Sequence, residues 1–112
     1  VNQQRAAAGV PALGAHGGLM SIAGNWSWAM ASQQTMVHSP EFCQQTFSMG
    51  FRRCAENIAR TGSPSASGVM NAWMGSAGHR ANILNPNLTH IGVGVVQGSD
   101  GRWYWTQNFG GY

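Results

Sequence analysis

Two runs of β-branched and aromatic residues near the end of the chain constrain its fold more than any other feature. They are Thr89 to Gln97 and Arg102 to Phe109, and Gly98-Ser99-Asp100-Gly101 lies between them. Turn-forming residues between two such runs are typical of a β-hairpin. A third short strand is predicted over Arg53 to Ala59, which has no strong helical period.

The remainder of the chain has mostly helical patterns. Leu19 to about Gln33 carries apolar residues at helical spacing, so this helix should pack against the core. Another helix is predicted over Val1 to Ala8 and is ended by Gly9 and Pro11. A short helix over Phe42 to Met49 is expected to begin with Ser39 as cap, Pro40 and the first-turn acid Glu41. A further helix is opened by Ser63 and Pro64 and interrupted at Gly75 and Gly78, and its apolar face consists of Val69, Met70, Trp73 and Met74. Four helices and three strands predict an α+β fold, with helices covering a short antiparallel sheet.

Length and charge narrow the function classes. With 112 residues, the chain is expected to form one domain over residues 1–112. Only 8% of residues are charged, and six arginines against three acids give a net charge of +3. The arginines are scattered, so nucleic-acid binding is not expected, whereas mild attraction to an anionic envelope component is. No apolar run reaches the roughly 20 residues of a membrane span, and we expect a soluble monomer without a transmembrane segment.

The chain has two cysteines, Cys43 and Cys54. A zinc site built from cysteines needs more of them at short paired spacings, so a disulfide is the better interpretation and two unrelated buried thiols are the alternative. A disulfide requires an oxidising compartment. The sequence therefore predicts a secreted or cell-envelope protein whose signal segment was removed before residue 1.

The four histidines and three acids can be considered one by one. Asp100 lies in the predicted turn, Glu41 is expected to act on a helix dipole, and His16 and His90 are expected to be solvated. His38, Glu56 and His79 remain. Two imidazoles and a carboxylate suit Zn²⁺ with water as fourth ligand, whereas a hydrogen-bonded core network is the alternative.

Several ordered elements of the sequence resemble the CAP superfamily of cysteine-rich secretory, antigen 5 and pathogenesis-related 1 proteins (the SCP domain), in its compact bacterial form. They are Asn2-x-x-Arg5 with Gly9, Pro11 and Leu13; His38-Ser39; Glu56-Asn57-Ile58-Ala59; Trp73-Met74-x-Ser76-x-Gly78-His79-Arg80-x-Asn82-Ile83-Leu84; Ile91-Gly92-Val93-Gly94; and Tyr104-x-x-Gln107-x-Phe109-Gly110. The resemblance extends over nearly the whole chain.

This resemblance implies a three-layer α/β/α sandwich whose central cleft is lined by His38, Glu56 and His79. Many members have a second glutamate in the cleft, but here the corresponding stretch reads Met74-Gly75-Ser76. Some members bind sterols, fatty acids or other apolar ligands, and others bind divalent metals at the two histidines. We therefore expect Zn²⁺ or another divalent cation at His38, His79 and Glu56, and a small apolar ligand such as a lipid.

The leading functional hypothesis is a secreted binding module. The five tryptophans and six methionines could line a ligand groove or simply build the core. A hydrolase is the alternative, with Ser76 or a metal-activated water as nucleophile and Glu56 as acid or base, but Met74 stands where a G-x-S-x-G elbow needs glycine. We expect no peptidase or esterase activity that depends on Ser76. A third hypothesis is a cell-envelope interaction module without catalysis.

Overall fold

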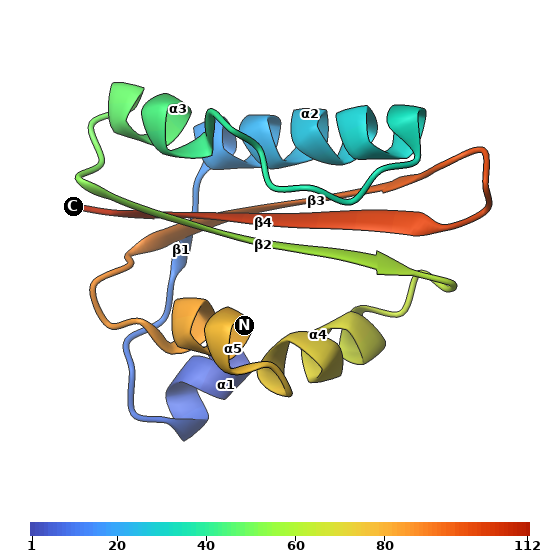
Figure 1. Cartoon of the computed structure of the whole chain (residues 1–112). Coiled ribbons are helices and arrows are strands. Elements are labelled where there is room, and N and C mark those ends of the chain that lie inside the picture. Colours follow the sequence, from blue (N-terminus) through green and yellow to red (C-terminus); the bar gives the residue numbers. More distant parts are fainter.

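The computed structural model describes all 112 residues as three layers, with a sheet between two groups of helices (Figure 1). Helices α2 and α3 cover one face of the sheet, and α1, α4 and α5 cover the other. The elements in chain order are α1 (Asn2–Ala7), β1 (Gly14–Ala15), α2 (Gly17–Gln33), α3 (Phe42–Ser48), β2 (Arg53–Thr61), α4 (Ala66–Met74), α5 (Ala77–Leu84), β3 (His90–Gln97) and β4 (Trp103–Gly111). The α+β fold and the α/β/α layering are therefore confirmed.

The sheet has the strand order β1-β3-β4-β2, so the last strand of the chain occupies a central position. β4 runs antiparallel to both neighbours, and Thr106 is the register partner of Ile58 on β2 and of Gly94 on β3. β1 pairs in parallel with the start of β3, at Gly14–His90 and Ala15–Ile91. The predicted hairpin and the predicted strand over 53–59 are confirmed, although each strand differs slightly in its ends.

The prediction of four helices and three strands was too low by one of each, because the structure has five helices and four strands. The additional strand, β1, has only two residues, which is too few to show an alternating pattern. The additional helix is α5. Gly75 does end α4, but Ser76 then begins α5, and Gly78 lies inside that helix and does not interrupt it.

The helix caps also differ in part from those predicted. Glu41, not Ser39, is the N-cap residue of α3, and the Ser39 hydroxyl accepts a hydrogen bond from the Glu41 main-chain N–H at 3.3 Å. Ser65, not Ser63, caps α4 by accepting from Gly68 N. His16 was expected to be solvated, but its Nδ1 caps α2 by accepting from Leu19 N at 3.2 Å.

The two faces of the sheet have different cores. Successive side chains of a strand point to opposite faces, so the even-numbered positions of β2, β3 and β4 face α2 and α3, which we call the α2 face. The odd-numbered positions face α1, α4 and α5, which we call the α4 face. The larger apolar cluster lies on the α4 face and contains Leu13, Val69, Trp73, Ile83, Leu88, Trp105 and Phe109.

Two glycines bring α2 close to the sheet. A Cβ atom added at Gly92 would overlap the main chain of Leu19 and Met20, and one at Gly94 would lie 2.6 Å from Gly24 Cα. Ser27 of α2 is fully buried and its hydroxyl lies 2.7 Å from that of Thr106 on β4. Close main-chain approach therefore replaces side-chain packing over this part of the α2 face.

Arg5 fastens α1 to the end of α5. Its side chain is 1% exposed and donates to four main-chain carbonyl oxygens, those of Pro11, Ile83, Asn85 and Leu88, at 2.6–3.2 Å. Hydrogen bonds to carbonyl groups satisfy the buried guanidinium in place of a carboxylate. None of the five helices is both long enough and apolar enough to cross a lipid bilayer.

Candidate functional site

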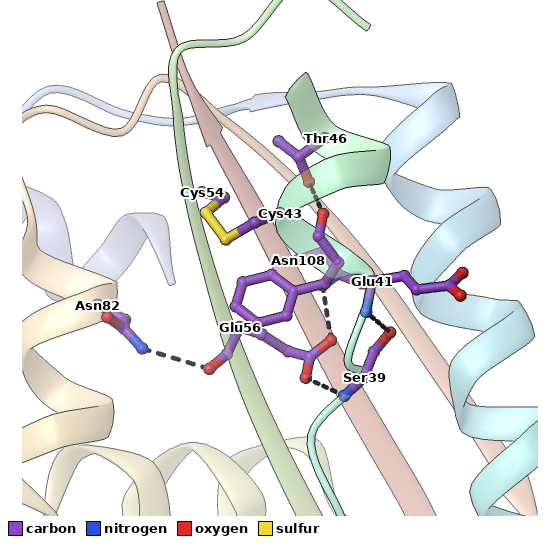
Figure 2. Close-up of a disulfide and its surroundings, with 9 residues drawn as sticks. Ser39, Glu41, Cys43, Thr46, Cys54, Glu56, Asn82 and Asn108 are labelled. Carbon is purple, nitrogen blue, oxygen red and sulfur yellow. Dashed lines mark hydrogen bonds between the residues drawn. A yellow bond between two sulfur atoms is a disulfide. The ribbon is translucent and has the colours of Figure 1, made fainter. Parts of the chain in front are cut away.

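Glu56 is the centre of the hydrogen-bonded site on the α2 face. Its side chain has no exposed surface. Oε1 accepts from Ser39 N at 2.9 Å and Oε2 accepts from Asn108 Nδ2 at 2.9 Å, as Figure 2 shows. His38 Nδ1 lies 2.9 Å from Oε1 and is the third partner. Three partners on one carboxylate explain how an acid can be buried beside apolar residues.

His38 is held by Glu56 on one side of its ring and is open on the other. The Glu56 carboxylate can only accept hydrogen bonds, as it does from Ser39 and Asn108. Nδ1–H of His38 is therefore the donor to Oε1. The neutral ring then carries its lone pair on Nε2. The His38 side chain is 54% exposed, so this arrangement leaves a nitrogen that can accept a proton or bind a cation.

The disulfide between Cys43 and Cys54 is confirmed. It joins α3 to β2, with the two Cα atoms 5.3 Å apart, and Cys54 lies two residues before Glu56 (Figure 2). The crosslink therefore holds the helix that follows His38 and Ser39 against the strand that carries Glu56.

Asn57, the next residue on β2, points to the α4 face and belongs to a second polar network. Its Nδ2 donates to His79 O and to Gln107 Oε1, both at 3.1 Å. Asn82 Nδ2 donates to Asn57 Oδ1 at 2.9 Å and to the main-chain oxygen of Glu56 at 3.3 Å. These amides were not among the predicted site residues. Gln107 and Asn108 inside a largely aromatic strand are the signal that could have identified them.

The structure brings together two of the three predicted cleft residues by direct contact. His38 and Glu56 form a hydrogen bond, whereas His79 lies in the first turn of α5, in the opposite helical layer, and its ring makes no hydrogen bond. No three His, Cys, Asp or Glu side chains are arranged to hold a metal ion. Glu56 fits the position of an acceptor that orients His38 better than that of a ligand, because its oxygens are already engaged. Metal binding by the three residues stays a prediction.

An apolar cavity lies on the α4 face, between α4, the start of α1 and the sheet. Its volume is about 410 Å³, and eight of its ten lining residues are hydrophobic. The lining residues are Val1, Asn2, Ala66, Val69, Met70, Trp73, Ile91, Val93, Trp105 and Gln107. Trp73 and Trp105 are therefore part of both the core cluster and the cavity wall, so the two predicted roles of the tryptophans coincide at these positions.

The remaining candidates have local roles. Ser76 is the N-cap residue of α5, and its hydroxyl makes no hydrogen bond with a histidine or an acid. Glu41 is exposed and stands just before α3, not in its first turn. His90 was expected to be solvated but is half-buried. Its ring contacts those of His16, Phe51 and Tyr112, and the His16 ring also contacts Phe51, at centroid separations of 5.0–5.9 Å.

Asp100 has the structural role that its turn position predicts. Oδ1 accepts from Arg102 N at 3.1 Å, and Oδ2 accepts from the Tyr104 hydroxyl at 2.7 Å. The Tyr104 hydrogen bond lowers the pKa of the Asp100 carboxyl below its ordinary value. Burial, followed by the same hydrogen bond, raises the pKa of Tyr104.

Comparison with known proteins places this geometry in a family. The model of the cysteine-rich secretory protein family, CAP, matches residues 1–109. The uncharacterized protein YkwD of Bacillus subtilis is 47% identical over 77 residues, which are 69% of this chain and 28% of that protein. The chain thus spans less than a third of the length of this relative.

Solved structures give the same result for the fold. An extracellular SCP-domain protein from Bacillus anthracis is 28% identical with a TM-score of 0.83, and the match covers 99% of this chain and 37% of that one. An outer surface protein of Borrelia burgdorferi has a TM-score of 0.86 at 18% identity, and the match covers 98% of this chain and 85% of that one. The chain, with its α/β/α layers and its His38–Glu56 pair, belongs to the cysteine-rich secretory protein (CAP) family.

Proposed function

We propose that this CAP domain is an extracellular binding module that holds a small apolar ligand, such as a lipid, in the cavity on the α4 face. The observation that carries the proposal is the cavity itself, with about 410 Å³ of space and eight hydrophobic residues among the ten that line it. Pockets that bind small molecules have volumes of about 300–1,000 Å³ and mostly apolar walls. The cavity lies toward the lower end of that range, which favours a single apolar chain.

The cavity walls are held in place by the fold. Trp73 Nε1 donates to Ile58 O at 3.0 Å, and Trp105 Nε1 donates to Thr61 Oγ1 at 2.8 Å, so each indole is anchored at its polar end. Val93 is 45% exposed and forms part of the rim. A second, more polar cavity of about 530 Å³ shares Val1, Asn2, Ala66 and Met70 with the first, which gives a longer ligand room to continue along α1.

An extracellular location is supported by two independent observations. The Cys43–Cys54 disulfide requires an oxidising environment to form and persist. The similar proteins from Bacillus anthracis and Borrelia burgdorferi are described as extracellular and outer surface proteins, respectively.

Binding is favoured over hydrolysis because no nucleophile is assembled with a base. Catalytic serines are activated by a histidine within hydrogen-bonding reach. Ser76 Oγ makes no such bond, and the one histidine paired with an acid, His38, lies in the other layer of the sandwich.

The proposal is tested by filling the cavity. Val93→Trp places a large side chain at the rim, whereas Val95→Trp makes the same change two residues along β3, at a residue that is 41% exposed and does not line the cavity. Calorimetric titration with methyl decanoate should show binding to the parent and to Val95→Trp, and a loss of at least about tenfold in affinity for Val93→Trp. Equal binding by all three proteins would remove the cavity from consideration.

A second candidate function, binding of a divalent cation, is supported by the His38–Glu56 pair. We propose that the lone pair of His38 Nε2 is available to a metal, with Glu56 fixing the orientation of the ring as carboxylates do behind histidine ligands. His79 is the proposed second ligand. A cation held there would supply Lewis-acid chemistry, and the zinc titrations described below test this proposal.

A further inference from the structure

We infer that Gln107 determines which apolar ligands the cavity accepts, because its side-chain Nε2 is positioned to donate a hydrogen bond to an acceptor on the ligand. The inference rests on the proposed function and makes it more specific. It predicts a ligand with one apolar chain and a hydrogen-bond acceptor, such as a carboxylate or an ester carbonyl, at the end that enters the cavity.

The orientation of the Gln107 amide follows from the groups around it. His79 O is a main-chain carbonyl and can only accept, so the Asn57 atom 3.1 Å from it must be the amide nitrogen. The same nitrogen contacts Gln107 at 3.1 Å, and Gln107 must therefore present its oxygen. Asn82, which donates to Asn57 Oδ1 at 2.9 Å, agrees with this assignment. The amide nitrogen of Gln107 is consequently directed away from the network.

Gln107 Nε2 is a donor without a partner in the protein. The residue is only 2% exposed and lines the cavity, and no hydrogen bond is made by its Nε2. The enclosed side-chain atoms that lack a partner are Gln4 Oε1 and Asn108 Oδ1, and Gln107 Nε2 is not among them. Gln107 Nε2 therefore retains some accessible surface, and the cavity is the space that the Gln107 side chain lines. A buried donor is stabilised when an acceptor occupies that space.

The other polar side-chain groups around the cavity are already engaged. Asn2 Nδ2 and Oδ1 are bonded to the main chain of Leu13. The indole nitrogens of Trp73 and Trp105 donate to Ile58 and Thr61. No acidic side chain lines the cavity, so a cationic head group would find no carboxylate to pair with there. Gln107 Nε2 thus favours acceptor-bearing ligands over ammonium-bearing ones.

Three probes with the same ten-carbon chain length test this inference: methyl decanoate, decanoate and decyltrimethylammonium, each below its micelle-forming concentration. Methyl decanoate is the main probe, because a neutral ester separates the hydrogen bond from attraction to positive charge. We expect the ester and the carboxylate to bind the parent protein more tightly than the ammonium compound does.

Two variants remove the donor in different ways. Gln107→Glu keeps an oxygen for Asn57 Nδ2 and replaces the donor with an acceptor, whereas Gln107→Met removes both groups at similar size. Both should bind methyl decanoate about tenfold less tightly than the parent. Gln107→Glu should weaken decanoate further, by charge repulsion, and should not weaken decyltrimethylammonium. Thermal unfolding checks that each variant is folded.

A second measurement needs no variant. The side-chain NH₂ resonances of Gln107 in the parent should move downfield when methyl decanoate is added, because the amide then gains an acceptor. Unmoved resonances in a protein that binds the ester, or variants within about twofold of the parent, would overturn the inference. The cavity would remain the binding site if Val93→Trp still weakens binding by at least about tenfold. Absence of binding by all three probes to the parent would overturn the proposed function as well.

Discussion

The α2 face and the α4 face are formed by alternate residues of the same strands, but they are packed in opposite ways. On the α2 face, Gly92 and Gly94 allow the main chain of α2 to approach the sheet directly, and a disulfide ties α3 to β2. On the α4 face, Ile91 and Val93 occupy the alternate positions of β3, and their side chains line the 410 Å³ cavity.

This difference shows how one short strand can serve two purposes. With glycine at positions 92 and 94, β3 lies close to α2, and the Ser27 hydroxyl of α2 bonds to Gly94 O of β3 and to the Thr106 hydroxyl of β4. With valine and isoleucine at the intervening positions, the opposite side of the same strand keeps its helices at a distance. The strand is therefore closely packed on the α2 face and leaves space for a site on the α4 face.

The largest effect should come from breaking the close packing of the α2 face. Gly92→Ala would force the new Cβ into the main chain of α2, so the helix must move. We expect the free energy of unfolding to fall by about 3 kcal/mol or more. Urea denaturation measures it. Gly24→Ala, within α2 and with nothing within 4 Å of the added Cβ, is the control and should change stability by no more than about 1 kcal/mol.

A smaller loss should follow removal of the crosslink. The double variant Cys43→Ser/Cys54→Ser should lower the free energy of unfolding by about 2–3 kcal/mol, because the unfolded chain regains the freedom that the disulfide removes. The affinity for methyl decanoate should stay within about twofold of the parent, since the cavity lies on the other face. A parallel loss of ligand affinity would show that the two faces are coupled.

Zinc binding tests whether a site can combine residues from both layers. His38→Ala and His79→Ala should each weaken zinc binding by about tenfold or more, and Glu56→Gln by about tenfold through the loss of its orienting role. Calorimetric titration at about pH 7.5 and about pH 5.5 should show weaker binding at the lower pH, because protons compete for the imidazole nitrogens. If both histidine variants bind zinc as tightly as the parent, these residues belong to a structural network.

The smallest expected effect is on stability at acid pH and comes from Asp100 in the β3–β4 turn, which belongs to neither face. The Tyr104 hydroxyl lowers the pKa of Asp100 in the folded protein, so the ionised carboxyl stabilises the fold above its unfolded pKa of about 4. That contribution is lost as the pH falls through the lower, folded pKa. Asp100→Asn should therefore show a slightly shallower fall in melting temperature below about pH 4 than the parent. Identical acid profiles would contradict the assignment.

The fold was largely predictable because its main elements have clear periodicity. The hairpin has matching β-rich runs around Gly98–Gly101, and α2 has an apolar stripe. By contrast, β1 has only two residues, too few for a pattern, and the predicted interruption at Gly75 did not show that a separate helix, α5, begins after Ser76. Ser27 is a polar residue on the buried side of α2, and its hydroxyl is satisfied by Thr106. The burial of Ser27 could not be predicted, because Thr106 lies 79 positions further along the chain.

The site was predictable only in part. His38 and Glu56 were predicted together and are hydrogen-bonded, but the placement of His79 in the opposite layer depends on the path of the chain between β2 and α5. The alternation of side chains along β2 does imply that Glu56 and Asn57 point to different faces. What the sequence could not provide was the partner of each, because Gln107 and Asn108 reach them from β4.

The central position of β4 has a consequence for how the protein is made. Both β2 and β3 pair along their length with β4, which is the last of the four strands to be synthesised. Neither ladder can form until residues 103–111 are available, so the sheet assembles only after nearly the whole domain has left the ribosome. A chain that remains unfolded until then can be exported first and fold afterwards, in the compartment where Cys43 and Cys54 are oxidised.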